Sequence, residues 1–276
     1  MRNIDLPGGE QVSCLGQGTW MIGERKDRRD AEMAALRAGV DLGMTLIDTA
    51  EMYGEGASET LVGEAIAGRR DVLFLVSKAY PQNASRARLP RSCEASLKRL
   101  GTDRLDLYLL HWRGSVPLEE TIEAMQALQR GGKIRHWGVS NLDTEEMEEL
   151  VAAGGSSCAT DQVLYNLTRR GPEHDLLPWL HDHGMTVMAY SPVEQGRLPG
   201  NHRLQALASD LGVTPAQLAL AWVLRQPGLI AIPKAATVEH VRENRAAADI
   251  ALNADILAQL DMAFPLPRGR RPLEML

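Results

Sequence analysis

Four side chains with complementary acid–base chemistry occur in the first half of the chain: Asp48, Tyr53, Lys78 and His111. A phenol with a pKa of about 10 is a weak acid at neutral pH, but a nearby ammonium favours the phenolate and lowers that pKa. We expect Lys78 to act in this way on Tyr53, with Asp48 holding the ammonium in place. Such a phenol can donate a proton to a carbonyl oxygen while hydride reaches the carbonyl carbon. A neutral His111 imidazole would orient that carbonyl.

Each of these residues also has a purely structural interpretation. Tyr53 stands beside Gly54 and Gly56 and could be an ordinary loop tyrosine, and His111 with Trp112 could be two rings packed together at a rim. Taken together, the four types make chemical sense as one acid–base group. The joint pattern therefore favours catalysis.

The elements that must position these residues are recognisable as short apolar runs rich in Val, Ile and Leu. Runs without alternation are typical of strands buried on both faces, as in a parallel sheet. We predict eight strands, at Ser13–Gly16, Thr45–Asp48, Leu73–Ser77, Leu105–Leu110, Ile134–Ser140, Ala159–Val163, Thr186–Tyr190 and Leu229–Ile232.

Segments with helical spacing alternate with these strands. They include Arg28–Leu42, Leu118–Gln129 and Thr214–Leu224, and Thr144 and Ser58 mark further helix starts. Repeated β–α units over the whole length predict a parallel sheet with right-handed crossovers. Because an (β/α)8 barrel of about 250 residues is one domain, the 276 residues predict a single-domain closed barrel over 1–276. We expect a β-hairpin in Asn3–Val12 to plug its floor.

Polar residues stand where most of the predicted strands end. In an (β/α)8 barrel all carboxyl ends of the strands converge on one mouth, which carries the active site. We therefore expect one cluster of polar side chains there. Its members are Asp48, Lys78, His111, Ser140, Asn141, Gln162, Tyr190, Ser191 and Lys234.

The amino-acid composition limits the kinds of partner and ligand that the protein can bind. A net charge of −6 argues against general affinity for nucleic acid or an anionic membrane. The three cysteines lack CxxC or metal-like spacing, so we expect no disulfide, no metal site and a reducing cytoplasm. The one basic run, Arg268 to Arg271, is expected to be a solvated tail.

Five runs carry a resemblance to a known family. Nearly the whole chain resembles aldo-keto reductases, with the closest likeness to bacterial members of the methylglyoxal-reductase type. The resemblance implies a barrel that reduces small aldehydes or ketones with NADPH. The runs are LIDTAEMYG at 46–54, SK at 77–78, DLYLLHW at 106–112, GKIRHWGVSN at 132–141 and IPK at 232–234.

The resemblance also implies a role for each matching position. Tyr53 would be the general acid, Lys78 and Asp48 its tuning pair, and His111 the carbonyl-orienting group. Ser140, Asn141 and Gln162 would bind the nicotinamide carboxamide and Tyr190 would stack on the ring. The pyrophosphate path would be lined by Ser191, Pro192, Val193, Gln195 and Gly196. The adenosine end would be held by Lys234, Thr237, His240 and Asn244. Further cofactor contacts are expected at Gly18, Thr19, Trp20, Asp48, Ile232 and Ala235.

Two departures concern the choice of cofactor. Ala235 stands where many members have Ser after the phosphate-binding Lys, and His240 replaces an Arg that often clamps the 2′-phosphate. Lys234 still supplies a cation, so NADPH remains the expected cofactor. Gly16-Gln17-Gly18 lacks the third glycine and distant acid of a Rossmann fingerprint and is interpreted as a rim turn.

An aromatic cup is expected to receive the substrate. The loop after His111 is brief and only twelve residues follow Phe264, which favours small aldehydes and ketoaldehydes over large ligands. We also expect the enzyme to be a monomer. One alternative is an aldolase with Lys78 as a Schiff-base lysine, but it gives the 138–141 run no task. Another is a non-catalytic, NADP(H)-sensing regulatory subunit. The predicted cup consists of Trp20, Tyr53, Tyr80, His111 and Trp112.

Overall fold

The buried apolar runs form one eight-stranded parallel sheet in the computed structural model, which describes residues 1–276. Its strands pair in chain order, and two parallel bridges, Leu15 with Ala231 and Gly18 with Lys234, join the first strand to the last. The sheet therefore curls into an (β/α)8 barrel, as predicted. The strands are β3 (Gln17–Gly18), β4 (Leu46–Asp48), β5 (Phe74–Ala79), β6 (Leu105–Leu110), β7 (Ile134–Ser140), β8 (Thr160–Leu164), β9 (Thr186–Tyr190) and β10 (Leu229–Ala231).

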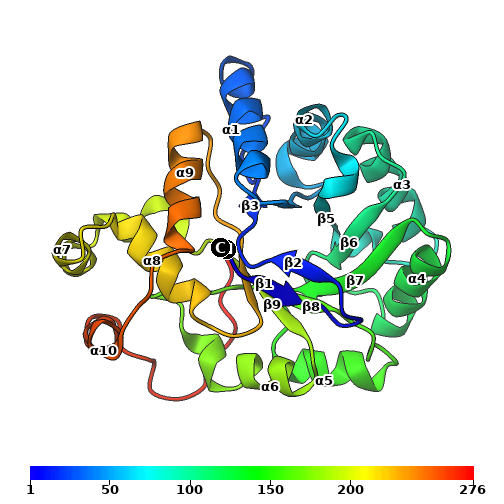
Figure 1. The fold of residues 1–276 in the computed structure, drawn as a ribbon. Helices are drawn as coiled ribbons and strands as arrows, with labels where there is room; N and C mark the ends of the chain where they lie inside the picture. The colour runs from blue at the N-terminus through cyan, green and yellow to red at the C-terminus, as the bar shows by residue number, and fades with distance from the viewer.

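Helices surround this barrel as an outer ring (Figure 1). Capping boxes start two of them, with Asp143 before α5 and Thr214 before α8. Reciprocal capping of this kind satisfies backbone N–H groups that have no partner inside the helix. The helices are α1 (Arg29–Asp41), α2 (Ala57–Ala65), α3 (Leu89–Leu100), α4 (Leu118–Arg130), α5 (Thr144–Ala152), α6 (Leu176–Asp182), α7 (His202–Asp210), α8 (Pro215–Leu224), α9 (Val238–Ala247) and α10 (Ala254–Ala263).

A two-stranded hairpin lies across the barrel end nearest the viewer in Figure 1. It pairs β1 (Asn3–Asp5) with β2 (Gln11–Ser13) in antiparallel register. Glu10 at its turn forms an ion pair with Arg135 and a 2.8 Å hydrogen bond with the His136 ring at the start of β7. These contacts place the hairpin at the amino ends of the strands, so the predicted floor plug is confirmed.

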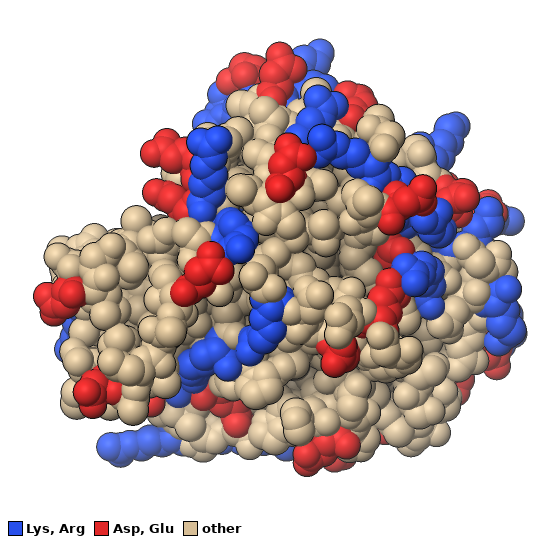
Figure 2. Space-filling model, viewed as in Figure 1, with Lys and Arg blue, Asp and Glu red and all other residues tan.

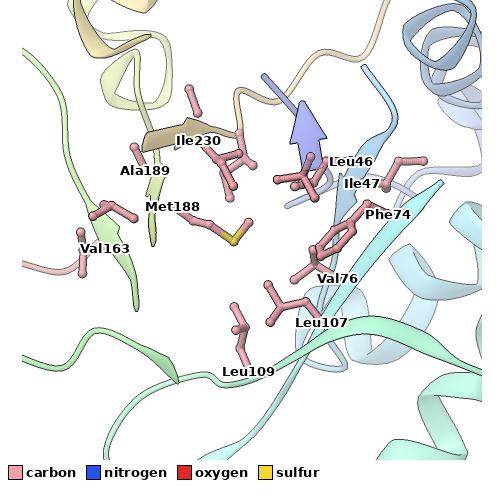
Figure 3. Packing of buried hydrophobic residues seen from close by; sticks show 14 of the residues in the cluster. Leu46, Ile47, Phe74, Val76, Leu107, Leu109, Val163, Met188, Ala189 and Ile230 are labelled. Atoms are coloured by element: carbon pink, nitrogen blue, oxygen red, sulfur yellow. The ribbon is translucent and has the colours of Figure 1, made fainter. Parts of the chain in front are cut away.

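Strand side chains fill the interior of the barrel. Figure 3 shows residues such as Val76, Leu109 and Met188, from strands on opposite sides, turned toward one shared space. All belong to a cluster of 67 buried hydrophobic residues. On the surface, Figure 2 shows acidic and basic side chains interspersed over the hairpin face. The barrel is thus a packed scaffold whose chemistry must lie at its rim.

One predicted strand is wrong. Ser13 ends the hairpin, and the barrel strand that follows is Gln17–Gly18, so the run at 16–18 is not a rim turn. A Cβ at Gly18 would lie 2.6 Å from the carbonyl oxygen of Ile232, which explains the glycine. Three other strands, β6, β7 and β9, have the predicted bounds, and the ends of the rest shift by one or two residues.

The C-terminal basic run, Arg268 to Arg271, is exposed, as expected for a solvated segment, but one of its arginines is paired. Arg270 pairs with Asp175 and Glu145, and Glu274 pairs with Arg169. The segment after α10 is therefore tied to the rest of the protein by ion pairs. No single helix is both long and apolar enough to span a membrane. Helices α7 and α8 reach that length and hydropathy only when taken together, and the pair is bent by 86°.

Candidate active site

The mouth of the barrel brings three of the predicted residues into direct contact. Asp48 ends β4, Lys78 lies near the end of the adjacent β5, and Tyr53 stands in the turn that follows β4. The Nζ atom of Lys78 lies 2.7 Å from Asp48 Oδ1 and 3.0 Å from the Tyr53 hydroxyl. Parallel pairing of β4 with β5 sets this arrangement, because it ends both strands at the same rim.

The ammonium of Lys78 is held in one orientation. It is fully buried, and its third contact is with the carbonyl oxygen of Thr49 at 3.0 Å. An ammonium has three protons to donate, so all of them are used. The second oxygen of Asp48 accepts from the amide of Gln162 at 2.8 Å. Both partners are therefore satisfied, as a buried ion pair requires.

The direction of the Tyr53 pKa differs from our expectation. Burial raises that pKa above its ordinary value, Lys78 lowers it, and the charge of Asp48 raises it. Lys78 thus acts in the predicted direction, but burial outweighs it and the net pKa is raised. The pKa of Lys78 is also raised above its ordinary value. Burial alone would lower it, but Asp48 and Tyr53 outweigh that effect. The phenol therefore keeps its proton at neutral pH.

His111 follows β6 and turns its ring toward Tyr53. The two ring centres lie 5.8 Å apart at 76°, an edge-to-face contact. Burial, with a smaller effect from Lys78, lowers the pKa of His111 to about 3. The imidazole is therefore neutral at physiological pH, as predicted. Its Nδ1 is buried without a hydrogen-bond partner.

Four of the five rings expected in the aromatic cup lie in contact with one another. Trp112 contacts His111 at 4.9 Å and meets Tyr80 edge-to-face at 6.0 Å between ring centres. With Tyr53 these rings make one continuous wall. Trp20 is 42% exposed and takes part in none of these ring pairs, so its place in the cup stays a prediction.

The residues expected to bind a carboxamide form a second network beside the first. Tyr190 donates its hydroxyl proton to Asn141 Oδ1 at 2.9 Å, and the Asn141 amide donates to Ser140 Oγ at 3.0 Å. The Ser140 hydroxyl donates to the carbonyl oxygen of Gln162 at 2.7 Å. Because Gln162 also bonds Asp48, the two networks are continuous across β4, β7, β8 and β9.

The segment after β9 has an unusual backbone. Ser191, Glu194 and Gln195 have positive φ angles of 47°, 52° and 54°, a region that residues with a Cβ rarely adopt. Gln195 and Gly196 are exposed, Ser191 and Val193 are half-buried, and Pro192 is buried. The expected pyrophosphate path is therefore a sharply turned rim segment.

The residues expected at the adenosine end gather around the start of α9. Lys234 and His240 are exposed, Ala235 is half-buried, and Ile232 and Asn244 are buried. Thr237 caps the helix by accepting from the backbone N–H of His240. Thr19 differs from the rest. It is fully buried. Its hydroxyl accepts a hydrogen bond from Ser58 and donates one to the carbonyl oxygen of Asp48, so it stabilises the backbone at the end of β4.

Glu51 is a functional candidate that the sequence analysis missed. Its carboxylate accepts from the Tyr80 backbone N–H at 2.7 Å, from Asn83 and from Ser92. It thereby joins the turn that carries Tyr53 to the loop that follows Lys78. Its position inside the 46–54 run was the available signal.

Residues 14–264 match a family model described as the aldo/keto reductase family. The chain belongs to the aldo/keto reductase family. This aldo/keto reductase is 51% identical to the methylglyoxal reductase YeaE of Escherichia coli (strain K12), over 99% of this chain and 98% of that protein. Family membership makes the chain an oxidoreductase, and the aldolase interpretation is wrong.

Solved structures give the same result. An aldo/keto reductase from Klebsiella pneumoniae in complex with NADP and acetate has a TM-score of 0.97 and 52% identity, covering 99% of each chain. A second structure from that organism, in complex with NADPH, has the same score and identity and covers 100% of this chain and 99% of its own. The likeness therefore extends over the whole reductase fold.

Proposed function

We propose that this aldo/keto reductase reduces small aldehydes and ketoaldehydes to alcohols with NADPH, with methylglyoxal as the first substrate to test. The observation that carries the proposal is the buried Lys78 ammonium, bonded at once to Asp48 and to the Tyr53 hydroxyl. The methylglyoxal reductase and the NADPH-bound relative support the choice of substrate and cofactor.

The chemistry of the side chains fits this cofactor. Neutral amide and hydroxyl groups of Ser140, Asn141 and Gln162 suit a carboxamide, and the adjacent Tyr190 ring offers a face for stacking. The exposed ammonium of Lys234 suits a phosphate. When bound there, NADPH supplies the hydride.

The residues of the chain would then handle the proton. The raised pKa of Tyr53 keeps its hydroxyl protonated and ready to donate to the carbonyl oxygen of the substrate. Lys78 would stabilise the phenolate left behind, because its ammonium already contacts that oxygen. Neutral His111 would orient the carbonyl. Residues 1–276 would act as one domain and as a monomer in the cytoplasm.

A two-stage assay tests the proposal. Quenching of tryptophan fluorescence on addition of NADPH reports cofactor binding, and loss of nicotinamide absorbance on subsequent addition of methylglyoxal reports reduction. We expect both signals. Binding without turnover of any small aldehyde would instead indicate a cofactor-sensing subunit, and absence of binding would reject the proposed function.

A further inference from the structure

Arg169, in the loop after β8, contacts two acidic residues from distant parts of the chain. Its guanidinium donates to Glu194 from Nε at 3.1 Å and from Nη2 at 2.7 Å, and to Glu274 from Nη1 at 2.5 Å. Arg169 therefore bridges the segment after β9 and the C-terminal segment. We refer to Arg169, Glu194 and Glu274 as the Arg169 clamp.

The Glu194 end of the clamp is nearly closed to solvent. Its side chain is 8% exposed and its second oxygen accepts from the Asn166 amide at 2.7 Å. Asn166 is fully buried and also donates to the carbonyl oxygen of Ser191 at 2.9 Å. Burial alone would raise the pKa of Glu194, but Arg169, Asn166 and, with a smaller effect, Arg197 hold that pKa below its ordinary value. Glu194 is thus a buried, negatively charged residue at the barrel rim, held by hydrogen bonds from other parts of the chain.

Glu194 lies within the segment whose backbone is strained. Ser191, Glu194 and Gln195 all have positive φ, and such a conformation persists only where surrounding contacts impose it. The bonds from Asn166 and Arg169 reach two of these three residues. Within the segment itself, backbone bonds and a contact from Arg197 Nη2 to Glu194 Oε1 at 3.1 Å also support the turn. Asn166 and Arg169 are the side chains that hold it from another part of the chain.

The C-terminal segment supports the other side of Arg169. It is tied to α5 and α6 by Arg270 and to Arg169 by Glu274, and between these ties it borders a cavity of about 320 Å³. Burial raises the pKa of the Tyr190 hydroxyl, and the Leu276 backbone lies close enough to lower it. The segment therefore ends beside the residue that precedes the strained turn.

We propose that Arg169 is a positioning residue that holds the 191–196 segment in the conformation that accepts the cofactor pyrophosphate, and that Glu274 holds Arg169 in place. The inference rests on the proposed function, because it takes this segment as the pyrophosphate path. Arg169 contacts none of Asp48, Tyr53, Lys78 and His111. Its loss should therefore weaken cofactor binding and leave the chemical step intact.

The test measures Kd for NADPH and NADH by fluorescence quenching, and kcat for methylglyoxal at saturating NADPH. For Arg169→Met we expect Kd to rise about tenfold for both cofactors, because the apparent Kd scales inversely with the fraction of competent protein. We expect kcat to stay within about twofold of wild type. Arg169→Lys should give an intermediate Kd. The equal effect on both cofactors separates this role from that of a 2′-phosphate ligand.

Glu274 provides the second arm of the test, since it is 47% exposed and its replacement should not disturb folding. Glu274→Gln should raise Kd by about two- to fivefold in the wild-type background, as one charge-assisted contact is lost. It should have no further effect in the Arg169→Met background. Arg104→Met is the matched control, because Arg104 also bridges two carboxylates, Asp71 and Asp103, but stands at the amino end of β6.

A folded Arg169→Met variant with wild-type Kd, or one whose loss is in kcat, would overturn the inference. If Arg169→Met does not fold, wild-type Kd in both Arg169→Lys and Glu274→Gln would overturn it equally. Failure of the wild type to bind NADPH would reject the proposed function instead.

Discussion

The Nζ of Lys78 lies 3.0 Å from the hydroxyl of Tyr53, and every proton of that ammonium has an acceptor. The contact stabilises a phenolate, yet burial keeps the phenol protonated in the resting site. Tyr53 therefore holds the proton that is to be donated. The Lys78 ammonium is already in place to stabilise the negative charge that forms on the phenol oxygen when that proton leaves.

Replacing Lys78 by Met should weaken the acid. Without the ammonium the pKa of Tyr53 rises further, and we expect kcat for reduction to fall about tenfold or more. Asp48 would also lose its buried partner, which destabilises the fold. The double variant Lys78→Met/Asp48→Asn controls for that loss, because it should recover stability without recovering kcat. A wild-type kcat in Lys78→Met would exclude the tuning role.

The two directions of the reaction should respond oppositely to pH. Reduction needs the protonated phenol and oxidation needs the phenolate. Since the pKa of Tyr53 is raised above 10, reduction should hold steady through neutral pH and fall only in the alkaline range, where oxidation should rise. Initial rates in both directions across this range are the measurement. Parallel trends would show that no single group serves as both acid and base.

His111 should make the fold sensitive to acid. Its pKa is about 3 in the folded protein against 6.5 for a free imidazole. Between these values the unfolded chain binds a proton that the folded protein does not, so stability is complete above pH 6.5 and is lost as pH falls toward 3. The loss should reach a few kcal/mol at most, roughly one per pKa unit for a partly exposed group.

Urea denaturation of wild type and His111→Gln over this pH range measures the effect. The difference between the two free energies of unfolding should shrink or reverse in favour of the variant as pH falls. A difference that does not change with pH would mean that His111 titrates normally in the folded protein.

Lys234 should set the choice between cofactors. Lys234→Ala removes the main cation expected at the 2′-phosphate, so Kd for NADPH should rise about ten- to a hundredfold, equivalent to about 1.5–3 kcal/mol. Kd for NADH should change little. Lys133→Ala is a suitable control, since Lys133 is exposed just before β7, at the other end of the barrel. Equal weakening of both cofactors would place Lys234 elsewhere, and equal affinity in the wild type would show that Ala235 and His240 have already shifted the preference.

Sequence patterns predicted the long strands well because buried parallel strands are continuous apolar runs. β3 was misplaced because it has only two residues, one of them Gly18, which is there for close backbone packing rather than for hydrophobicity. The charge effect of Lys78 on Tyr53 was predictable from residue types. The depth of burial, which decides the net pKa, was not.

The contacts of Arg169 and Arg270 show a second limit. Arg169 meets Glu194 and Glu274 across 25 and 105 residues, and Arg270 meets Glu145 across 125. No local pattern relates such positions. Side chains that resemble solvated surface charges in the sequence therefore form ion pairs between distant parts of the rim.

Replacement of Tyr53 by Phe tests the central claim most directly. The variant removes the phenolic oxygen and its proton and keeps the ring that contacts His111. We predict wild-type folding, a Kd for NADPH close to that of wild type, and a fall in kcat for methylglyoxal of about 10²–10⁴-fold. Retention of most of the reductase rate in a folded, NADPH-binding Tyr53→Phe variant would contradict the assignment of Tyr53 as the proton donor.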